Sequence, residues 1–382
     1  MAKATSVSKK PVTDTGSLAT SVSKKLVPVT GFVTPSTDTW REAELAGFLL
    51  PEQQTDIHEQ GWLKMLAPRA AGGAELPLPE VVRLEERIAA TDGSLGWVVT
   101  LCAGAGWFAG FLPPALAHDI MATPGVCLAG SGAPTGFADA DGDDFVLSGR
   151  WDYASGAPMA THFTLNAVLR ARGEVLRDEQ GKPRIRAFVV PARYVALEAS
   201  WQAIGLRASA SHAYRLDGTR IPASHGFTID AAHATADGPL YRFPFMALAY
   251  VTLAANLLGM ATHFLALAEP LIAARRQHGS GVPLGEVPSV AVRLAAAREA
   301  LATHRAALYE VLDRAWADVV RHAVADEAGL QRVSLQLVDT CRRTVDCLYP
   351  YCGLQAARDD VPINRVWRDF HTATQHALLL PD

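Results

Sequence analysis

Apolar residues recur at helical spacing in the first part of the chain, between residues 38 and 120. This spacing predicts helices, and breaker or capping residues separate them. The breaker cluster runs from Pro68 to Gly73, whereas the stretch Thr91–Ser94 ends one helix and caps the next. The predicted helices are Trp40–Leu49, Pro51–Leu66, Leu78–Ala90 and Leu95–Phe111.

The pattern changes between residues 121 and 235, where glycine, proline and β-branched residues become frequent and apolar positions alternate. Short alternating runs between turn residues predict strands. Within 144–165 we expect a strand, a tight Ser148-Gly149 turn, a second strand, a corner at Ala154–Ala157 and a return strand. The region therefore predicts a small β-barrel or sandwich. The strand candidates are Val126–Ala129, Phe145–Tyr153, Phe163–Arg170, Ile185–Val190, Tyr194–Leu197 and Ala213–Leu216.

Helical spacing returns after residue 240. The stretch Pro244–Ala274 is apolar nearly all round, as a central bundle helix should be. Three further helices are predicted over Val290–Ala325, Gly329–Leu348 and Ile363–Leu380. The order of helices, sheet and four-helix bundle predicts a mainly α chain with a central β-domain.

The first 30 residues differ from the rest. Five of the seven lysines lie there, and the stretch Ala4–Lys10 recurs as Ala19–Lys25. Because this polar segment cannot bury enough apolar surface to fold, we expect it to be a disordered tail. The predicted divisions are 1–30 (tail), 31–120 (N-terminal helical domain), 121–236 (β-domain) and 237–382 (C-terminal helical bundle).

Composition narrows the function classes. The 382 residues carry a formal net charge of −4 without a basic stripe, which argues against a nucleic-acid partner. Five scattered cysteines, none at metal-ligand spacing, favour a reduced, cytoplasmic setting without a disulfide framework or metal site. We find no apolar run expected to span a bilayer, and we interpret Trp97–Leu112 as a buried helix rather than a membrane contact.

Two glycine-rich segments in the β-region are candidates for ligand contact. The corner Ala154–Ala157 offers backbone N–H groups and the Ser155 hydroxyl beside an aromatic strand, which suits a planar heterocycle with hydrogen-bond acceptors. Such corners also occur in sheets that bind nothing. The glycines of 128–138 let backbone approach a ligand closely, but their spacing is neither a Rossmann nor a Walker loop. An ordinary glycine-rich turn is the alternative.

The motif Leu147-Ser-Gly-Arg-Trp151, followed by Ala154-Ser-Gly156, resembles the flavin-contacting segment of the acyl-CoA dehydrogenase superfamily. It is closer to the two-component flavin-dependent monooxygenases than to the dehydrogenases. The sequence around Trp97 resembles the superfamily's N-terminal helical domain. The resemblance covers nearly everything after the tail, and it implies an acyl-CoA dehydrogenase-like fold assembled as a homotetramer.

The same resemblance assigns flavin contacts. Ser155 would lie near the ring and help hold its oxygen adduct, while Ser131 and Thr135 would line the pyrimidine edge. Trp151 and Tyr153 would wall the ring, although we expect one of them to be core. The segment Trp201–Ser211 resembles a family turn that places Arg207 at a domain junction, with a surface arginine as the alternative. The segment that begins at Arg275 resembles one whose arginine reaches a flavin diphosphate in a neighbouring subunit; a solvated arginine is the alternative.

The C-terminal segment 364–376 distinguishes the two branches. Arg365, Arg368 and Asp369 have helical spacings that favour an ion-pair network. Monooxygenase relatives share the pattern W-R-D-x-H-x-x-x-x-H and use a histidine here, so His376 is the first catalytic candidate and His371 the second. Residues five apart do not share a helix face, so we expect only one to face the flavin. A capping histidine is the alternative.

These features predict a flavin-dependent monooxygenase that takes reduced FMN or FAD from a separate flavin reductase. With O2 it would oxygenate a small aromatic or heteroatom-bearing substrate. One alternative is an FAD enzyme of the acyl-CoA dehydrogenase type that oxidises a Cα–Cβ bond, but no glutamate follows Asp369 to act as its base. The other is a non-catalytic scaffold of the same superfamily.

Overall fold

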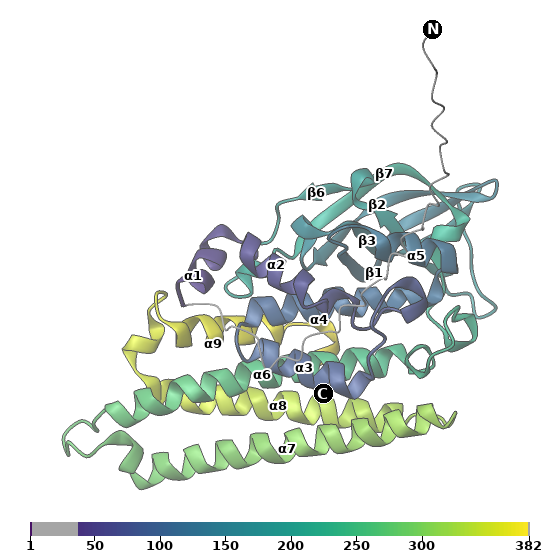
Figure 1. Cartoon of the computed structure of the whole chain (residues 1–382). Coiled ribbons are helices and arrows are strands. Elements are labelled where there is room, and N and C mark those ends of the chain that lie inside the picture. Colours follow the sequence, from purple (N-terminus) through teal and green to yellow (C-terminus); the bar gives the residue numbers. More distant parts are fainter. Residues whose placement is uncertain (2–36, 381–382) are drawn as a thin grey trace.

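The computed structural model describes residue 1 and residues 37–380. The predicted tail, apart from Met1, lies outside the described residues. The β-strands lie at one side of the molecule and the long C-terminal helices form the opposite side, with the N-terminal helices between and beside them (Figure 1). This order of helices, sheet and helices confirms the fold class expected from the sequence.

The four predicted N-terminal helices are present, α5 was not among them, and local conformation explains two of the helix boundaries. Asp92 caps α4, because its carboxylate accepts the Leu95 N–H at 2.7 Å. Helix α2 stops before the predicted end, since Gly61 takes a left-handed conformation with φ of 68°. A short 3-10 turn, Trp62–Lys64, follows it. The five α-helices are α1 Thr37–Ala46, α2 Pro51–Glu59, α3 Leu78–Ala89, α4 Gly93–Trp107 and α5 Pro114–Ala122.

One eight-stranded sheet forms the β-domain. Its main order is β6-β7-β2-β1-β3-β5-β8, with β4 paired to β3. Strands β1 and β3 run parallel, and the other pairs are antiparallel. The strands are β1 Leu128–Asp141, β2 Asp144–Ala154, β3 His162–Ala171, β4 Glu174–Val175, β5 Ile185–Pro191, β6 Ala196–Glu198, β7 His212–Pro222 and β8 Gly226–Phe227.

The sheet curls around its own apolar core. Tyr214 of β7 donates its hydroxyl to the Thr164 carbonyl of β3 at 2.8 Å, although β2 and β1 lie between these strands in the sheet. The Tyr214 ring also lies 4.7 Å from the Phe163 ring, measured between centroids. Contacts across three strand positions require a strongly curved sheet. Of the predicted barrel and sandwich, the structure therefore has a single curled, barrel-like sheet.

Two turn predictions in this region are wrong. No turn divides 144–154; instead β2 continues through Ser148 and Gly149 with a register shift against β7. The Ser148 hydroxyl accepts the Gly218 N–H of β7 at 3.1 Å. The glycine-rich stretch 128–138 belongs to β1 rather than to a loop, with its irregularity between Ser131 and Gly136. Glycine and serine mark bulges as well as turns, and the local pattern does not distinguish them.

The C-terminal bundle consists of α6 Phe245–Ala274, α7 Pro288–Val320, α8 Glu327–Cys352 and α9 Pro362–Ala373. Helix α9 ends before the predicted Leu380. The chain then turns, and Arg342 of α8 donates to the carbonyls of Thr374 and Leu379 at 3.0 and 2.6 Å. These bonds satisfy two backbone carbonyls that lie beyond the end of the helix. Because α9 ends at Ala373, His376 lies in a turn rather than on α9.

Two helical segments are long and apolar enough to cross a bilayer, contrary to the expectation from the sequence. They are Gly93–Phe111 and Phe245–Ala274, and 83% and 78% of their most apolar windows are buried within the protein. Such burial is typical of core helices in globular proteins. Gly96 shows how tightly α4 packs, because a Cβ there would lie 2.6 Å from the Ala89 Cα of α3.

The Tyr214 hydroxyl bond predicts a measurable contribution to stability. We expect Tyr214→Phe to lower the free energy of unfolding by about 1–2 kcal/mol, because the buried Thr164 carbonyl loses this hydrogen bond. Urea unfolding would measure it. The control is Tyr194→Phe on an exposed tyrosine, with an expected change near zero. Equal stability of both variants would contradict the role of this bond in closing the sheet.

Candidate active site

Ser155 lies directly after β2, in the predicted corner, and is 4% exposed. Its hydroxyl accepts a hydrogen bond from the Trp97 indole N–H of α4 at 3.1 Å. It also lies 2.9 Å from the Ser211 hydroxyl, which in turn lies 2.7 Å from that of Ser209. Three buried hydroxyls and one indole therefore form a continuous hydrogen-bonded chain between α4 and the segment before β7.

The hydrogen bonds to Trp97 and Ser211 leave Ser155 one hydrogen-bonding position. A hydroxyl has one donor and two acceptor positions. Trp97 can only donate, so it fills one acceptor position of Ser155, and Ser211 takes a second position as donor or acceptor. The serine protons can reverse direction together, so Ser155 can offer a ligand either a proton or a lone pair.

His376 contacts the same tryptophan. The two ring centroids lie 6.0 Å apart in an edge-to-face arrangement. Ser155 and His376 are 376 − 155 = 221 positions apart in sequence. The structure brings both of them to the Trp97 side chain. Trp97 itself was not singled out as a site residue from the sequence, where it appears as one of many apolar residues in its helix.

A hydrogen bond from the backbone determines which tautomer His376 adopts. Its Nδ1 accepts the Leu378 N–H at 3.3 Å, so the neutral ring carries its proton on Nε2. Burial lowers the pKa of His376, which favours this neutral form at neutral pH. In this arrangement the ring offers a ligand a hydrogen-bond donor. The capping interaction named as the alternative is also present, because His376 caps the turn Ala377–Leu379.

His371 faces elsewhere. Its Nε2 lies 3.2 Å from the Asp346 carboxylate of α8, and its ring lies 4.4 Å from that of Trp367. Burial lowers the pKa of His371, while Asp346 opposes that shift. The two histidines therefore have different surroundings: His376 contacts Trp97, and His371 lies between α9 and α8.

The two aromatic candidates, Trp151 and Tyr153, differ sharply in solvent exposure. Trp151 has no exposed surface; its indole donates to the Asn166 carbonyl at 2.9 Å and stacks on Tyr214. Trp151 is therefore a core residue, as expected for one of these two aromatic side chains. Tyr153 is 72% exposed and has a φ of 67°. That left-handed conformation, beside a register shift, breaks the alternation of β2 and turns Tyr153 outward.

The remaining cofactor candidates contact other parts of the chain. Thr135 donates to the Arg150 carbonyl at 2.6 Å, and Ser131 is half-buried beside the irregularity of β1. Arg207 donates to the Ala203 carbonyl at 3.1 Å and lies 3.7 Å from Glu44. Exposed Arg275 donates to the Tyr351 carbonyl near the end of α8. These contacts leave the roles of all four as predictions.

A buried ion cluster lies beside the site. Arg365 of α9 is 2.7 Å from the Asp92 carboxylate at the start of α4 and 3.7 Å from Asp369 one turn along α9. Asp369 accepts the Leu206 N–H of the loop before β7 at 2.5 Å. These side chains are 7% exposed or less. The predicted ion-pair network at Arg365 and Asp369 is confirmed, but its partner Asp92 was not foreseen.

A second pair extends the cluster outward. Arg368 pairs with Glu44 of α1 and also donates to the Ile204 carbonyl at 2.7 Å. Gly205 permits this contact, since a Cβ there would lie 2.1 Å from the Arg368 carbonyl oxygen. The helix α9, the loop before β7 and α1 are therefore held together by charged side chains.

One positive charge faces two carboxylates in the buried cluster, and this affects protonation. Burial raises the pKa of Asp369 to about 7; Arg365 opposes the rise and Asp92 adds to it. Asp92 already accepts the Leu95 N–H and lies closer to Arg365. Asp369 is therefore the carboxyl that holds a proton below neutral pH.

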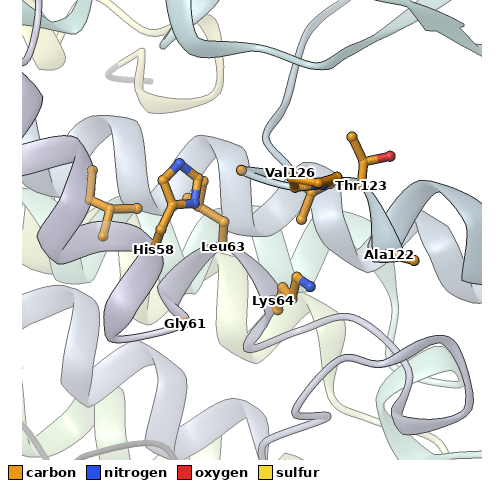
Figure 2. Close-up of a pocket in the computed structure, with 10 residues that line it drawn as sticks. His58, Gly61, Leu63, Lys64, Ala122, Thr123 and Val126 are labelled. Carbon is orange, nitrogen blue, oxygen red and sulfur yellow. The ribbon is translucent and has the colours of Figure 1, made fainter.

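Two cavities lie away from this cluster. One of about 210 Å³ lies between the end of α2 and the segment joining α5 to β1 (Figure 2). The other, about 580 Å³, lies between the end of α6 and the start of α7. Ser155 and His376 line neither. Among the described residues, no group of three or more His, Cys, Asp or Glu side chains is placed to hold a metal ion.

The proton on Asp369 predicts a pH-dependent stability difference. In the unfolded state Asp369 has its ordinary pKa of 3.8, so it loses this proton at a lower pH than in the folded state. We therefore expect the stability of the natural chain relative to Asp369→Asn to fall as pH rises from 5 to 7, by about 1 kcal/mol per unit. Asparagine keeps an acceptor for the Leu206 N–H.

Urea unfolding of both proteins at several pH values would measure this difference. Asp313→Asn, which breaks an exposed ion pair with Arg83, is the matched control and should give a pH-independent difference. A difference between the natural chain and Asp369→Asn that does not change with pH would contradict the buried proton.

Known proteins resemble this chain in sequence and in structure. Residues 251–381 match the family "Acyl-CoA dehydrogenase, C-terminal domain". The FADH(2)-dependent resorcinol hydroxylase, oxygenase component, of a Rhizobium species is 26% identical, over 83% of this chain and 81% of its own length.

Two solved structures share the fold. The 3-HSA hydroxylase of Rhodococcus sp. RHA1 has a TM-score of 0.81 at 19% identity, covering 90% of both chains. XiaF from a Streptomyces species, solved with FADH2 and glycerol, has a TM-score of 0.79 at 23% identity, covering 90% of this chain and 88% of XiaF. The resemblance expected from the sequence is thus confirmed: the chain has the acyl-CoA dehydrogenase fold, and it is similar over most of its length to oxygenase components of flavin-dependent monooxygenases.

Proposed function

We propose that this protein is the oxygenase component of a two-component flavin-dependent monooxygenase. It would take reduced FMN or FAD from a separate flavin reductase and use O2 to oxygenate a small aromatic or heteroatom-bearing substrate. The observation that carries the proposal is the meeting of Ser155 and His376 at Trp97. The sequence relative named as an oxygenase component and the structural relative solved with FADH2 support the cofactor class.

The residues present fit a planar flavin ring. Ser155 retains one hydrogen-bonding position, His376 offers its Nε2 proton, and Tyr153 exposes an aromatic side chain near the corner. When bound, a reduced flavin would supply the chemistry that activates O2. The protein would orient the ring through Ser155, hold a proton at His376 Nε2, and keep water from the reacting atoms with the apolar body of Trp97.

The other candidate contacts enter as parts of this proposal. Ser131 and Thr135 would line the pyrimidine edge of the ring, and Arg207 would contribute charge at the domain junction. Arg275 is exposed directly after α6, and it would contact the flavin diphosphate of a neighbouring subunit. A homotetramer in the cytoplasm is the assembly and setting that we propose.

The acyl-CoA dehydrogenase alternative lacks the glutamate expected after Asp369, although some dehydrogenase branches place their base on another helix. From Asp369 to Leu380 the sequence contains no glutamate. Asp369 itself is buried in the ion cluster, where it accepts the Leu206 N–H. A neutral histidine is suited to a phenol or amine rather than to the α-proton of a thioester.

Replacement of His376 tests the catalytic assignment. We expect His376→Ala to lower product formation by about 100-fold, because a positioned donor typically contributes that much or more. Reduced-flavin affinity should stay within a few-fold, since Ser155 and Tyr153 remain. The assay supplies reduced flavin from a reductase, offers phenols and indoles, and detects by mass spectrometry the gain of one oxygen atom.

His371→Ala is the matched control, because that ring contacts α8 rather than Trp97. It should retain most of the product formation. Equal loss in the two variants, or full activity of His376→Ala, would remove His376 from the reaction.

A further inference from the structure

The smaller cavity has an asymmetric lining. Figure 2 shows His58 on one side, Ala122 and Thr123 on the other, and Lys64 below. Its walls are otherwise mostly apolar, formed by Ile57, Leu63, Ala122, Pro124 and Val126. The cavity therefore combines basic side chains with an apolar surface.

The two basic side chains have no acidic partner among residues 37–380. Within this part of the chain, no ion pair involves Lys64 or His58, and the ammonium group of Lys64 donates to the Met121 carbonyl at 2.6 Å. Burial lowers the pKa of both groups, and the charge of Lys64 lowers the pKa of His58 further. An anion between them would relieve this repulsion and accept further hydrogen bonds from the Lys64 ammonium group, which has three donors.

The neighbouring acids do not fill this role. Asp56 and Glu59 share helix α2 with His58, and the pKa of Asp56 is raised by burial and then by Glu59 and Glu52, without a contribution from either base. Asp119 of α5 contributes only its carbonyl, which accepts the Thr123 hydroxyl at 3.2 Å. The sequence gives a further signal: Lys64 and Lys182 are the only lysines after residue 30.

Size and lining restrict the ligand. A volume of about 210 Å³ exceeds the roughly 150 Å³ of a cavity that binds benzene. One ring with a carboxylate would fit, with the ring on the apolar walls and the carboxylate at Lys64. A bare inorganic anion would leave those walls without a partner.

We infer that this cavity binds a small aromatic carboxylate, held by Lys64 and His58, at a site separate from Ser155 and His376. The inference goes beyond the proposed function, since none of the lining residues is among the proposed flavin contacts. The site would give the protein a binding function for acidic ring compounds that does not depend on bound flavin.

Calorimetric titration of the flavin-free full chain with benzoate tests the site. We expect binding of benzoate, and none of its neutral analogue benzamide. Lys64→Gln should weaken benzoate at least tenfold, about 1.4 kcal/mol, because the amide can still donate to Met121 but carries no charge. The control Lys182→Gln, on the other remaining lysine, is exposed and should bind like the natural chain.

A pH series identifies the role of His58. Because a bound anion favours the protonated ring, affinity for benzoate should increase as pH falls from 7.5 to 5.5, and His58→Gln should remove most of that increase. Ser155→Ala should leave benzoate binding unchanged, which separates this site from the proposed flavin site.

Absence of benzoate binding, equal binding of benzamide, or unchanged affinity in Lys64→Gln would each overturn the inference. Acetate and phosphate are the comparison anions, and binding of either as tightly as benzoate would also overturn it. None of these outcomes bears on flavin binding, so failure here and failure of the proposed function are distinguishable. Thermal unfolding of each variant verifies that it is folded.

Discussion

One buried guanidinium shared by two carboxylates holds the parts of this protein in place. Arg365 lies between Asp92, which caps α4, and Asp369, which accepts a backbone N–H from the loop before β7. Removing one partner of a buried ion pair typically costs about 3–5 kcal/mol, because the charge that remains has neither water nor a counter-ion. The cluster therefore joins the N-terminal helices, the β-domain and α9 by a constraint that none of them can satisfy alone.

The candidate active site depends on the same three parts. Helix α4 carries Trp97 one turn after its capped start, and the loop held by Asp369 continues to Ser209 and Ser211. Helix α9 leads into the turn that presents His376. His376 and Ser211 thus follow closely on a residue of the cluster, whereas Ser155, directly after β2, joins them through its bonds to Trp97 and Ser211. The geometry of the site is a consequence of buried charge at a junction, rather than of any single domain.

Periodicity was sufficient to predict the order of helices, sheet and helices, and helical spacing identified Arg365 and Asp369 as partners. It could not identify Asp92, which lies 273 positions away and meets Arg365 only in the folded chain. Nor could it separate Trp151 from Tyr153, which have the same strand parity. The left-handed backbone at Tyr153 decides which ring is exposed. Local patterns carry element type, whereas bulges and distant contacts depend on packing that the whole chain determines.

We propose that Ser155, Trp97 and His376 form the site of a protein that receives reduced flavin from elsewhere. Anaerobic titration of the purified chain with FMN and FAD, each in the reduced and the oxidised form, is the most direct test. We expect the protein to be purified without flavin and to bind a reduced flavin more tightly than the same flavin oxidised. Stoichiometric FAD that stays bound in the oxidised form through purification, or no binding of either form, would contradict it.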